Sequence, residues 1–178
     1  MRSLRRYFVF GPLIAAAVAF ADAAPAAAKD TGVCTLLTRS EAGKLLGAKV
    51  VKTEKKTSKI NDAQECTYKT NKAQKQFKDR GAKMQLEVTV QPVTDKLRAE
   101  LQRIPTNEGE RVEGLGDEAY ATKFDYVIAV SGNTAVQAKL QNYQGSPTKF
   151  RSVSEGAVRM ALPRLDRVSV KPPSSAPS

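Results

Sequence analysis

The sequence predicts an α+β domain, with an antiparallel sheet of about five strands, three helices and one disulfide. Three observations lead to this class. Apolar and polar residues alternate from Met84 to Gln91, as in a strand with one buried face. Three other segments carry apolar residues at helical spacing. The two cysteines, Cys34 and Cys66, follow a segment that is typical of an export signal.

The first predicted helix covers residues 39–46. Thr38-Arg39-Ser40-Glu41 is a capping box, in which the Thr38 hydroxyl and the Glu41 carboxylate each bind a backbone N–H of the other residue. Gly47 can end the helix, because glycine readily adopts the left-handed conformation found there.

Two more helices are predicted downstream. The second carries Val93, Leu97, Leu101 and Ile104 at helical spacing and stops at Pro105. The third begins at Ser146-Pro147, and Pro163 ends or kinks it. Its apolar stripe consists of Phe150, Val153, Ala157, Met160 and Ala161.

Shorter apolar runs predict the other strands, at 65–69, 119–122, 126–130 and 136–141, and a strand start at 49–51. Residues 131–133 suit a hairpin turn. Three polar segments are expected to be loops or exposed connections, at 52–63, 70–83 and 107–113. Sequential hairpins are the simplest topology, with the helices covering the apolar face of the sheet.

Residues 1–28 have the organisation of a signal peptide. Three arginines precede an apolar stretch, Tyr7 to Phe20, that is short for a membrane span. Small-residue sites of the Ala-x-Ala type place cleavage between residues 23 and 29; the alternative is a retained anchor. We therefore expect one α+β domain at 29–168, a disordered tail at 169–178 and no transmembrane segment after cleavage.

The cysteines and the absence of histidine restrict the chemistry. In an oxidising compartment Cys34 and Cys66 most simply form one disulfide, which would contribute about 3–4 kcal/mol by closing a loop of roughly 30 residues. A redox dithiol, the alternative, normally needs a Cys-x-x-Cys pair. Histidine-based nucleophile pairs and metal sites are excluded, and no nucleotide-binding motif is present. We expect no enzyme activity and no cofactor.

The acidic residues give little reason to expect a metal site or an enzyme. Glu113, Asp117 and Glu118 surround a Gly-Leu-Gly turn, but they lack the spacing of a calcium loop, so we expect no metal site. A carboxylate-based hydrolase remains an alternative, because any chain with this many acidic residues offers carboxylate pairs.

The positive charge belongs to the predicted mature domain. Removing residues 1–28 takes away three of the 29 basic and one of the 18 acidic residues, which leaves a net charge of +9. Such a charge favours anionic partners, although scattered lysines can also simply maintain solubility.

Ten basic residues in two segments flank the predicted strand at 65–69, and we expect them to converge at one end of the sheet. They could attract an anionic lipid or polysaccharide of the envelope; the alternative is a solvated lysine-rich face. Aromatic residues are sparse in both segments, so we expect no nucleic-acid partner. The candidate residues are Lys52, Lys55, Lys56, Lys59, Lys69, Lys72, Lys75, Lys78, Arg80 and Lys83.

Three short motifs follow one another in a characteristic order: Cys34-Thr35-Leu36-Leu37-Thr38, then Cys66-x-Tyr68, then Gly114-Leu115-Gly116-Asp117-Glu118-Ala119. This order, over about 33–165, resembles small exported bacterial proteins and lipoproteins of unknown function. The resemblance implies an envelope or secreted location, a Cys34–Cys66 disulfide and an α+β sandwich. It transfers no catalytic residue. The chain has no cysteine at the cleavage site, where the lipoprotein members are anchored.

These features predict a periplasmic or secreted protein that is not an enzyme and that binds an anionic envelope component or an envelope protein. A structural or accessory subunit of an envelope assembly is the main alternative. The sequence does not predict the oligomeric state.

Overall fold

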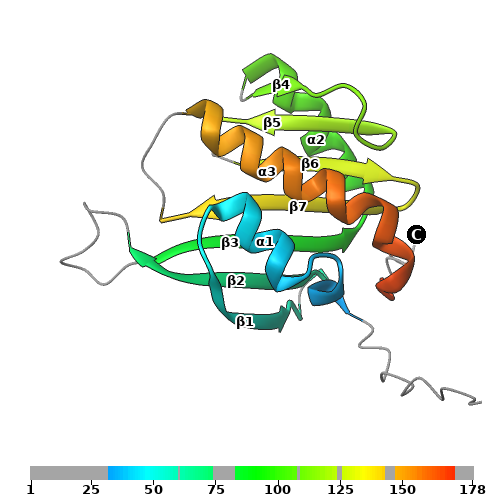
Figure 1. Ribbon diagram of the computed structural model, residues 1–178. Helices are drawn as coiled ribbons and strands as arrows, with labels where there is room; N and C mark the ends of the chain where they lie inside the picture. The colour runs from blue at the N-terminus through cyan, green and yellow to red at the C-terminus, as the bar shows by residue number, and fades with distance from the viewer. Residues whose placement is uncertain are drawn as a thin grey trace, which may run out of the picture.

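The computed structural model describes residues 32–59, 61–73, 83–107, 109–123, 126–142 and 147–170. These residues form one sheet with helices on both of its faces: α1 and α3 lie on one face and α2 on the other (Figure 1). The predicted signal peptide at 1–28 lies outside the described residues.

The described residues contain three α-helices and seven strands. The helices are α1 (Arg39–Leu46), α2 (Asp95–Asn107) and α3 (Pro147–Ala161). Two short 3-10 helices, η1 (Val33–Thr35) and η3 (Leu162–Arg167), lie at the two ends. The strands are β1 (Val50–Thr57), β2 (Gln64–Ala73), β3 (Lys83–Pro92), β4 (Gly109–Arg111), β5 (Glu118–Thr122), β6 (Tyr126–Ser131) and β7 (Thr134–Gln141).

The sheet is antiparallel, as predicted, but the prediction of about five strands is wrong. The described residues form seven, in the order β1-β2-β3-β7-β6-β5-β4. β1 lies largely where the sequence predicts a loop over 52–63, and β4 lies inside the predicted loop at 107–113. Both are edge strands, which pair on one side only and need no alternating apolar face. Most side chains of β1 are accordingly exposed.

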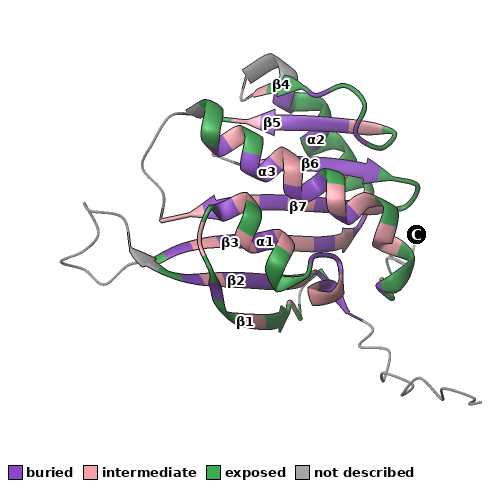
Figure 2. Cartoon of the chain, viewed as in Figure 1, coloured by how far each residue is buried: buried purple, intermediate pink, exposed green. Residues whose placement is uncertain are grey.

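Sequential hairpins build each half of the sheet, and the pairing of β3 with β7 joins the halves. On the face that carries α1 and α3, Leu86 pairs with Leu140 and Val88 with Ala138 in the larger core. Buried residues are concentrated in the strands beneath these helices (Figure 2). On the other face, α2 packs near the β4–β6 end, and the side chains of β1, β2, β3 and β7 are mainly polar.

The ends of α1 are confirmed, whereas the predicted end of α2 is wrong. The Glu41 N–H donates to Thr38 Oγ1 at 3.2 Å, the Thr38 N–H donates to Glu41 Oε2 at 2.8 Å, and Gly47 has φ 61°. α2 continues through Pro105 to Asn107. A proline removes one helical N–H donor, but packing of Ile104 in the core favours the helical turn despite this loss.

The predicted disulfide between Cys34 and Cys66 is present, with the two Cα atoms 5.1 Å apart. Tyr68 lies two residues further along β2, and its hydroxyl donates to the carbonyl oxygens of Leu37 at 2.9 Å and Cys34 at 3.3 Å. Burial raises the pKa of Tyr68 to about 12. The Cys-x-Leu-Leu and Cys-x-Tyr motifs therefore form one structural unit, which holds η1 against the sheet.

The C-terminal segment returns to the sheet beyond the predicted domain boundary. The side-chain amide of Gln64 donates to the Ser169 carbonyl at 2.8 Å, and Val170 packs against the larger core. The domain thus reaches at least two residues past 168. Residues 171–178 of the predicted tail lie outside the described residues.

Candidate functional site

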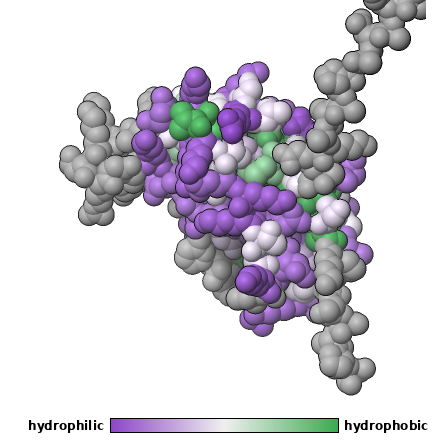
Figure 3. Space-filling model, turned by 90° about the horizontal axis from the view of Figure 1, so that it is seen from below, coloured by the Kyte–Doolittle hydropathy of each residue, from purple (hydrophilic) through white to green (hydrophobic). Residues whose placement is uncertain are grey.

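Most of the predicted basic residues that are described lie along the β1 edge of the sheet. Lys52, Lys55 and Lys56 belong to β1, Lys59 follows that strand, and Lys69 belongs to β2. The surface at this edge is mainly hydrophilic when seen from below (Figure 3). Lys83 is the first residue of β3. Lys75, Lys78 and Arg80 lie outside the described residues. The backbone of Lys72 belongs to β2, but its side chain is also outside the described part.

Acidic side chains accompany these lysines. A carboxylate oxygen of Glu54 lies 2.8 Å from Lys52 Nζ and the other lies 2.5 Å from Lys69 Nζ. The hydrogen bonds from Lys52 and Lys69 lower the pKa of Glu54 to about 2. Lys56 Nζ lies 3.8 Å from Glu65. These carboxylates reduce the positive potential at the edge.

The lysines also divide between the two faces of the sheet. In the register of β1 and β2, Lys52 lies opposite Lys69, and Lys56 lies opposite Glu65. Lys55 lies opposite Cys66, a residue of the core face. Successive residues of a strand point to opposite faces, so Lys52 and Lys56 lie on the other face from Lys55. Lys52, Lys55 and Lys56 therefore share one edge without forming a single patch. Their role in binding an anionic partner stays a prediction.

The carboxylates of the Gly-Leu-Gly turn have structural partners. Asp117 Oδ2 accepts a hydrogen bond from the Gly132 N–H at 2.7 Å, which ties the turn to the β6–β7 hairpin. Glu118 lies 3.5 Å from Arg98 of α2 and accepts a hydrogen bond from the Tyr120 hydroxyl. Within the described part of the chain, no group of three metal-ligating side chains is placed to hold an ion.

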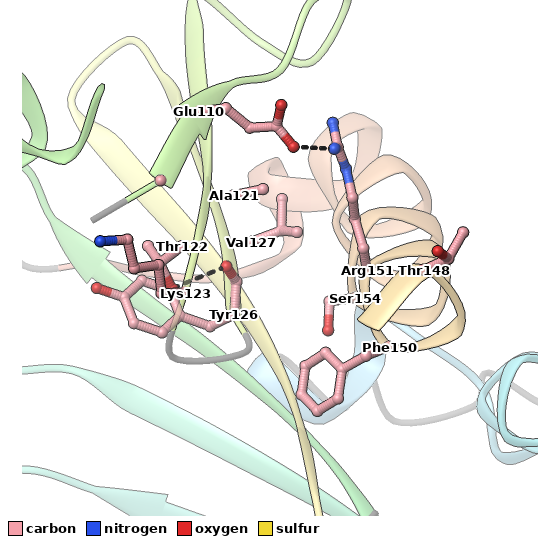
Figure 4. A pocket seen from close by; sticks show the side chains of 11 residues that line it. Glu110, Ala121, Thr122, Lys123, Tyr126, Val127, Thr148, Phe150, Arg151 and Ser154 are labelled. Carbon is pink, nitrogen blue, oxygen red and sulfur yellow. Dashed lines mark hydrogen bonds and ion pairs between the residues drawn. The ribbon is translucent and has the colours of Figure 1, made fainter. Parts of the chain in front are cut away.

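A cavity of about 660 Å³ lies between α3 and the strands β4, β5 and β6; we call it the α3 cavity (Figure 4). Ala121, Val127 and Phe150 contribute apolar walls, and Ser154 borders it from α3. This volume lies within the range of about 300–1,000 Å³ that is typical of small-molecule sites.

Ser154 is a buried polar residue in this wall. Its side chain is fully buried, and its hydroxyl has no hydrogen-bond partner among the described residues. Ser154 and Phe150, one helical turn apart, extend from the side of α3 that faces the strands (Figure 4). An unpaired buried hydroxyl destabilises a fold by about 1–3 kcal/mol. A hydroxyl can both donate and accept a hydrogen bond, so it suits a polar group of a ligand.

Charged residues lie at the exposed side of the cavity. Arg151 of α3 forms an ion pair with Glu110 of β4 (Figure 4). Their side chains are 40% and 63% exposed, respectively. Arg151 Nε also lies 3.8 Å from Glu155, one turn further along α3. Lys123, which follows β5, adds a second cation to the lining.

The sequence patterns did not reveal this site, although one signal was present. Ser154 lies four residues after Phe150 and three before Ala157, so it belongs to the buried side of the predicted third helix. A polar residue at such a position is a candidate for a special role. Glu110 and Arg151 are 41 positions apart, and only the tertiary fold brings them together.

Comparisons with protein-family models, with curated proteins and with solved structures found no match. The resemblance to small exported bacterial proteins therefore stays a prediction. The disulfide is consistent with the expected periplasmic or secreted location, because disulfides persist in oxidising compartments. None of the described helices is both long enough and apolar enough to cross a membrane.

Proposed function

We propose that this protein is an exported, non-catalytic binding protein that holds a small amphiphilic molecule in the α3 cavity. The observation that carries this proposal is Ser154, a residue of the cavity wall whose buried hydroxyl has no hydrogen-bond partner among the described residues. A ligand that forms a hydrogen bond there removes an energetic penalty of the unliganded fold. The apolar walls favour a ligand with an apolar body.

The same surroundings favour binding over bond-making. A serine nucleophile needs a base within hydrogen-bond distance to accept its proton. The Ser154 hydroxyl has none among the described residues, the sequence contains no histidine, and both cysteines are in the disulfide.

Export is the second part of the proposal. Residues 1–28 carry the pattern of a signal peptide, and the disulfide suits an oxidising compartment. A ligand met there would be a component of the envelope, in agreement with the partner class expected from the net charge.

The neutral fluorescent probe N-phenyl-1-naphthylamine tests whether the α3 cavity binds ligands. We expect the purified protein to bind it saturably with increased fluorescence. Thr148→Trp, which places a large side chain at the cavity, should weaken binding about tenfold or more. Thr89→Trp, on the polar face of β3, is the matched control and should bind like the unchanged protein. Equal binding by both variants would place the probe elsewhere and contradict the proposal.

Ser154→Ala tests separately whether the buried Ser154 hydroxyl lacks a hydrogen-bond partner. Because it removes an unpaired buried hydroxyl, we expect it to raise the free energy of unfolding by about 1 kcal/mol in urea titrations. It should also weaken the binding of dodecanol, whose hydroxyl can pair with Ser154. The control is Ser152→Ala, where the exposed hydroxyl donates to the Lys149 carbonyl at 2.9 Å. A stability loss confined to Ser154→Ala would show that its hydroxyl has a partner, and the basis of the proposal would fail.

A further inference from the structure

We infer that the ligand of the α3 cavity carries an anionic head group on an apolar body, and that this head group binds Arg151 in place of Glu110. The inference rests on the proposed function and names its ligand class. The lining of the cavity contains two cations, Arg151 and Lys123, and one anion, Glu110. Its charge therefore complements an anion rather than a cation.

Glu110 is suited to exchange with a ligand. It lies on β4, an edge strand of three residues, and its side chain is 63% exposed. Ion pairs between exposed side chains are weak, so a competing anion can replace this carboxylate at small cost. A carboxylate or phosphate of a ligand can form the same charge-assisted hydrogen bonds with the guanidinium group.

Arg151 and Ser154 can act on the same head group. They are three residues apart on α3 and therefore lie on one side of the helix, and both border the cavity. The apolar body would then lie against Phe150 and Val127. The second carboxylate near Arg151, that of Glu155, also binds Arg159 at 3.2 Å. It therefore need not move when a ligand replaces Glu110.

A series of ligands with one chain length and different head groups tests the inference. Dodecanoate, dodecyl phosphate, dodecanol and dodecyltrimethylammonium would each displace N-phenyl-1-naphthylamine from the protein. We expect the anions to bind at least tenfold more tightly than dodecanol, and the cation to bind most weakly. The comparison of dodecanoate with dodecyl phosphate identifies which acidic group the site prefers.

Variants of the ion pair then locate the head group. Arg151→Gln should weaken binding of the anions about tenfold without affecting dodecanol, Arg151→Lys should restore most of the loss, and Glu110→Gln should strengthen anion binding several-fold. Arg167→Gln and Glu113→Gln, at exposed residues outside the cavity lining, are the matched controls, and neither should change the affinities. Melting temperatures establish that each variant is folded.

These experiments distinguish a failure of the inferred head-group site from a failure of the proposed function. If the anions and dodecanol bind equally well to every protein, or if Arg151→Gln weakens all ligands alike, the inferred head-group site is wrong and the proposed cavity stands. If neither the probe nor any of the four chains binds, the proposed function itself is wrong.

Discussion

Arg164 ties the end of the described chain to its beginning. Its guanidinium donates to both carboxylate oxygens of Glu41, at 2.6 and 2.8 Å, and to the Leu36 carbonyl at 2.8 Å. The bonds from Arg164 to Glu41, together with the one from the Thr38 backbone N–H, lower the pKa of Glu41 to about 2. One carboxylate thus serves two roles, in the helix cap of α1 and in the contact with η3.

Arg164→Gln should lower the free energy of unfolding by about 1–3 kcal/mol near neutral pH, because it removes charge-assisted hydrogen bonds. Since the folded pKa of Glu41 is depressed, this stabilisation is complete above its ordinary pKa of 4.5 and disappears as the pH falls toward about 2. Urea titrations at several pH values should show the difference between the two proteins shrinking over that range. Arg167→Gln, an exposed arginine of η3, is the control; a pH-independent difference for Arg164→Gln would contradict the role of Glu41.

At the scale of elements, the turn between β4 and β5 is held against the β6–β7 hairpin. The Asp117 N–H donates to the Val130 carbonyl at 2.8 Å, and the Asp117 carboxylate accepts a hydrogen bond from the Gly132 N–H. Gly116 has φ 61°, and a Cβ at this position would lie 2.2 Å from the Val130 carbonyl oxygen. A close approach of two backbones therefore explains Gly116 and Asp117 of the Gly-Leu-Gly-Asp motif.

Gly116→Ala should destabilise the protein by more than about 2 kcal/mol, because its Cβ would collide with the backbone of β6 as well as strain a left-handed residue. Gly114→Ala is a close control: φ is 71°, but no atom of the described structure lies within 4 Å of the added Cβ. It should cost about 1–2 kcal/mol. Thermal unfolding of the two variants would separate backbone strain, present in both, from the collision, present only in Gly116→Ala. Equal losses of stability would contradict the close approach.

At the scale of the whole molecule, the β1 edge carries side chains of both charges. Lys52 and Lys69 flank Glu54, and Lys56 lies near Glu65. Lysines on an edge strand also discourage pairing with another sheet, which gives this edge a structural explanation independent of any ligand. If these lysines instead attract an anionic partner, the protein should bind anionic surfaces through this edge; if their role is only structural, it should not.

Reversal of Lys52, Lys55, Lys56 and Lys59 to glutamate tests whether the edge attracts anionic partners. If it does, cosedimentation with vesicles of phosphatidylglycerol should be strong at low salt, fall steeply toward physiological salt and disappear in the variant. A control variant carries the same change at exposed basic residues elsewhere, Lys44, Lys96, Arg111 and Arg167. Binding that is equal in both variants would contradict the prediction for the edge and leave its structural explanation.

The sequence by itself determined the features that depend on neighbouring residues. The capping box at Thr38 and Glu41, the turn at Gly47 and the alternation in β3 are local patterns, because their hydrogen bonds or periodicity lie within a few residues. The disulfide could also be predicted, because only two cysteines were available.

The tertiary structure alone decided the number of strands and the α3 cavity. The edge strands β1 and β4 form because a neighbouring strand offers unpaired backbone groups, and their own side chains carry no alternating apolar pattern. Ser154, Arg151 and Glu110 meet at one cavity only after α3 has packed on the sheet. Contacts between residues that are distant in the chain leave no periodic signal, so they had to be found in the fold.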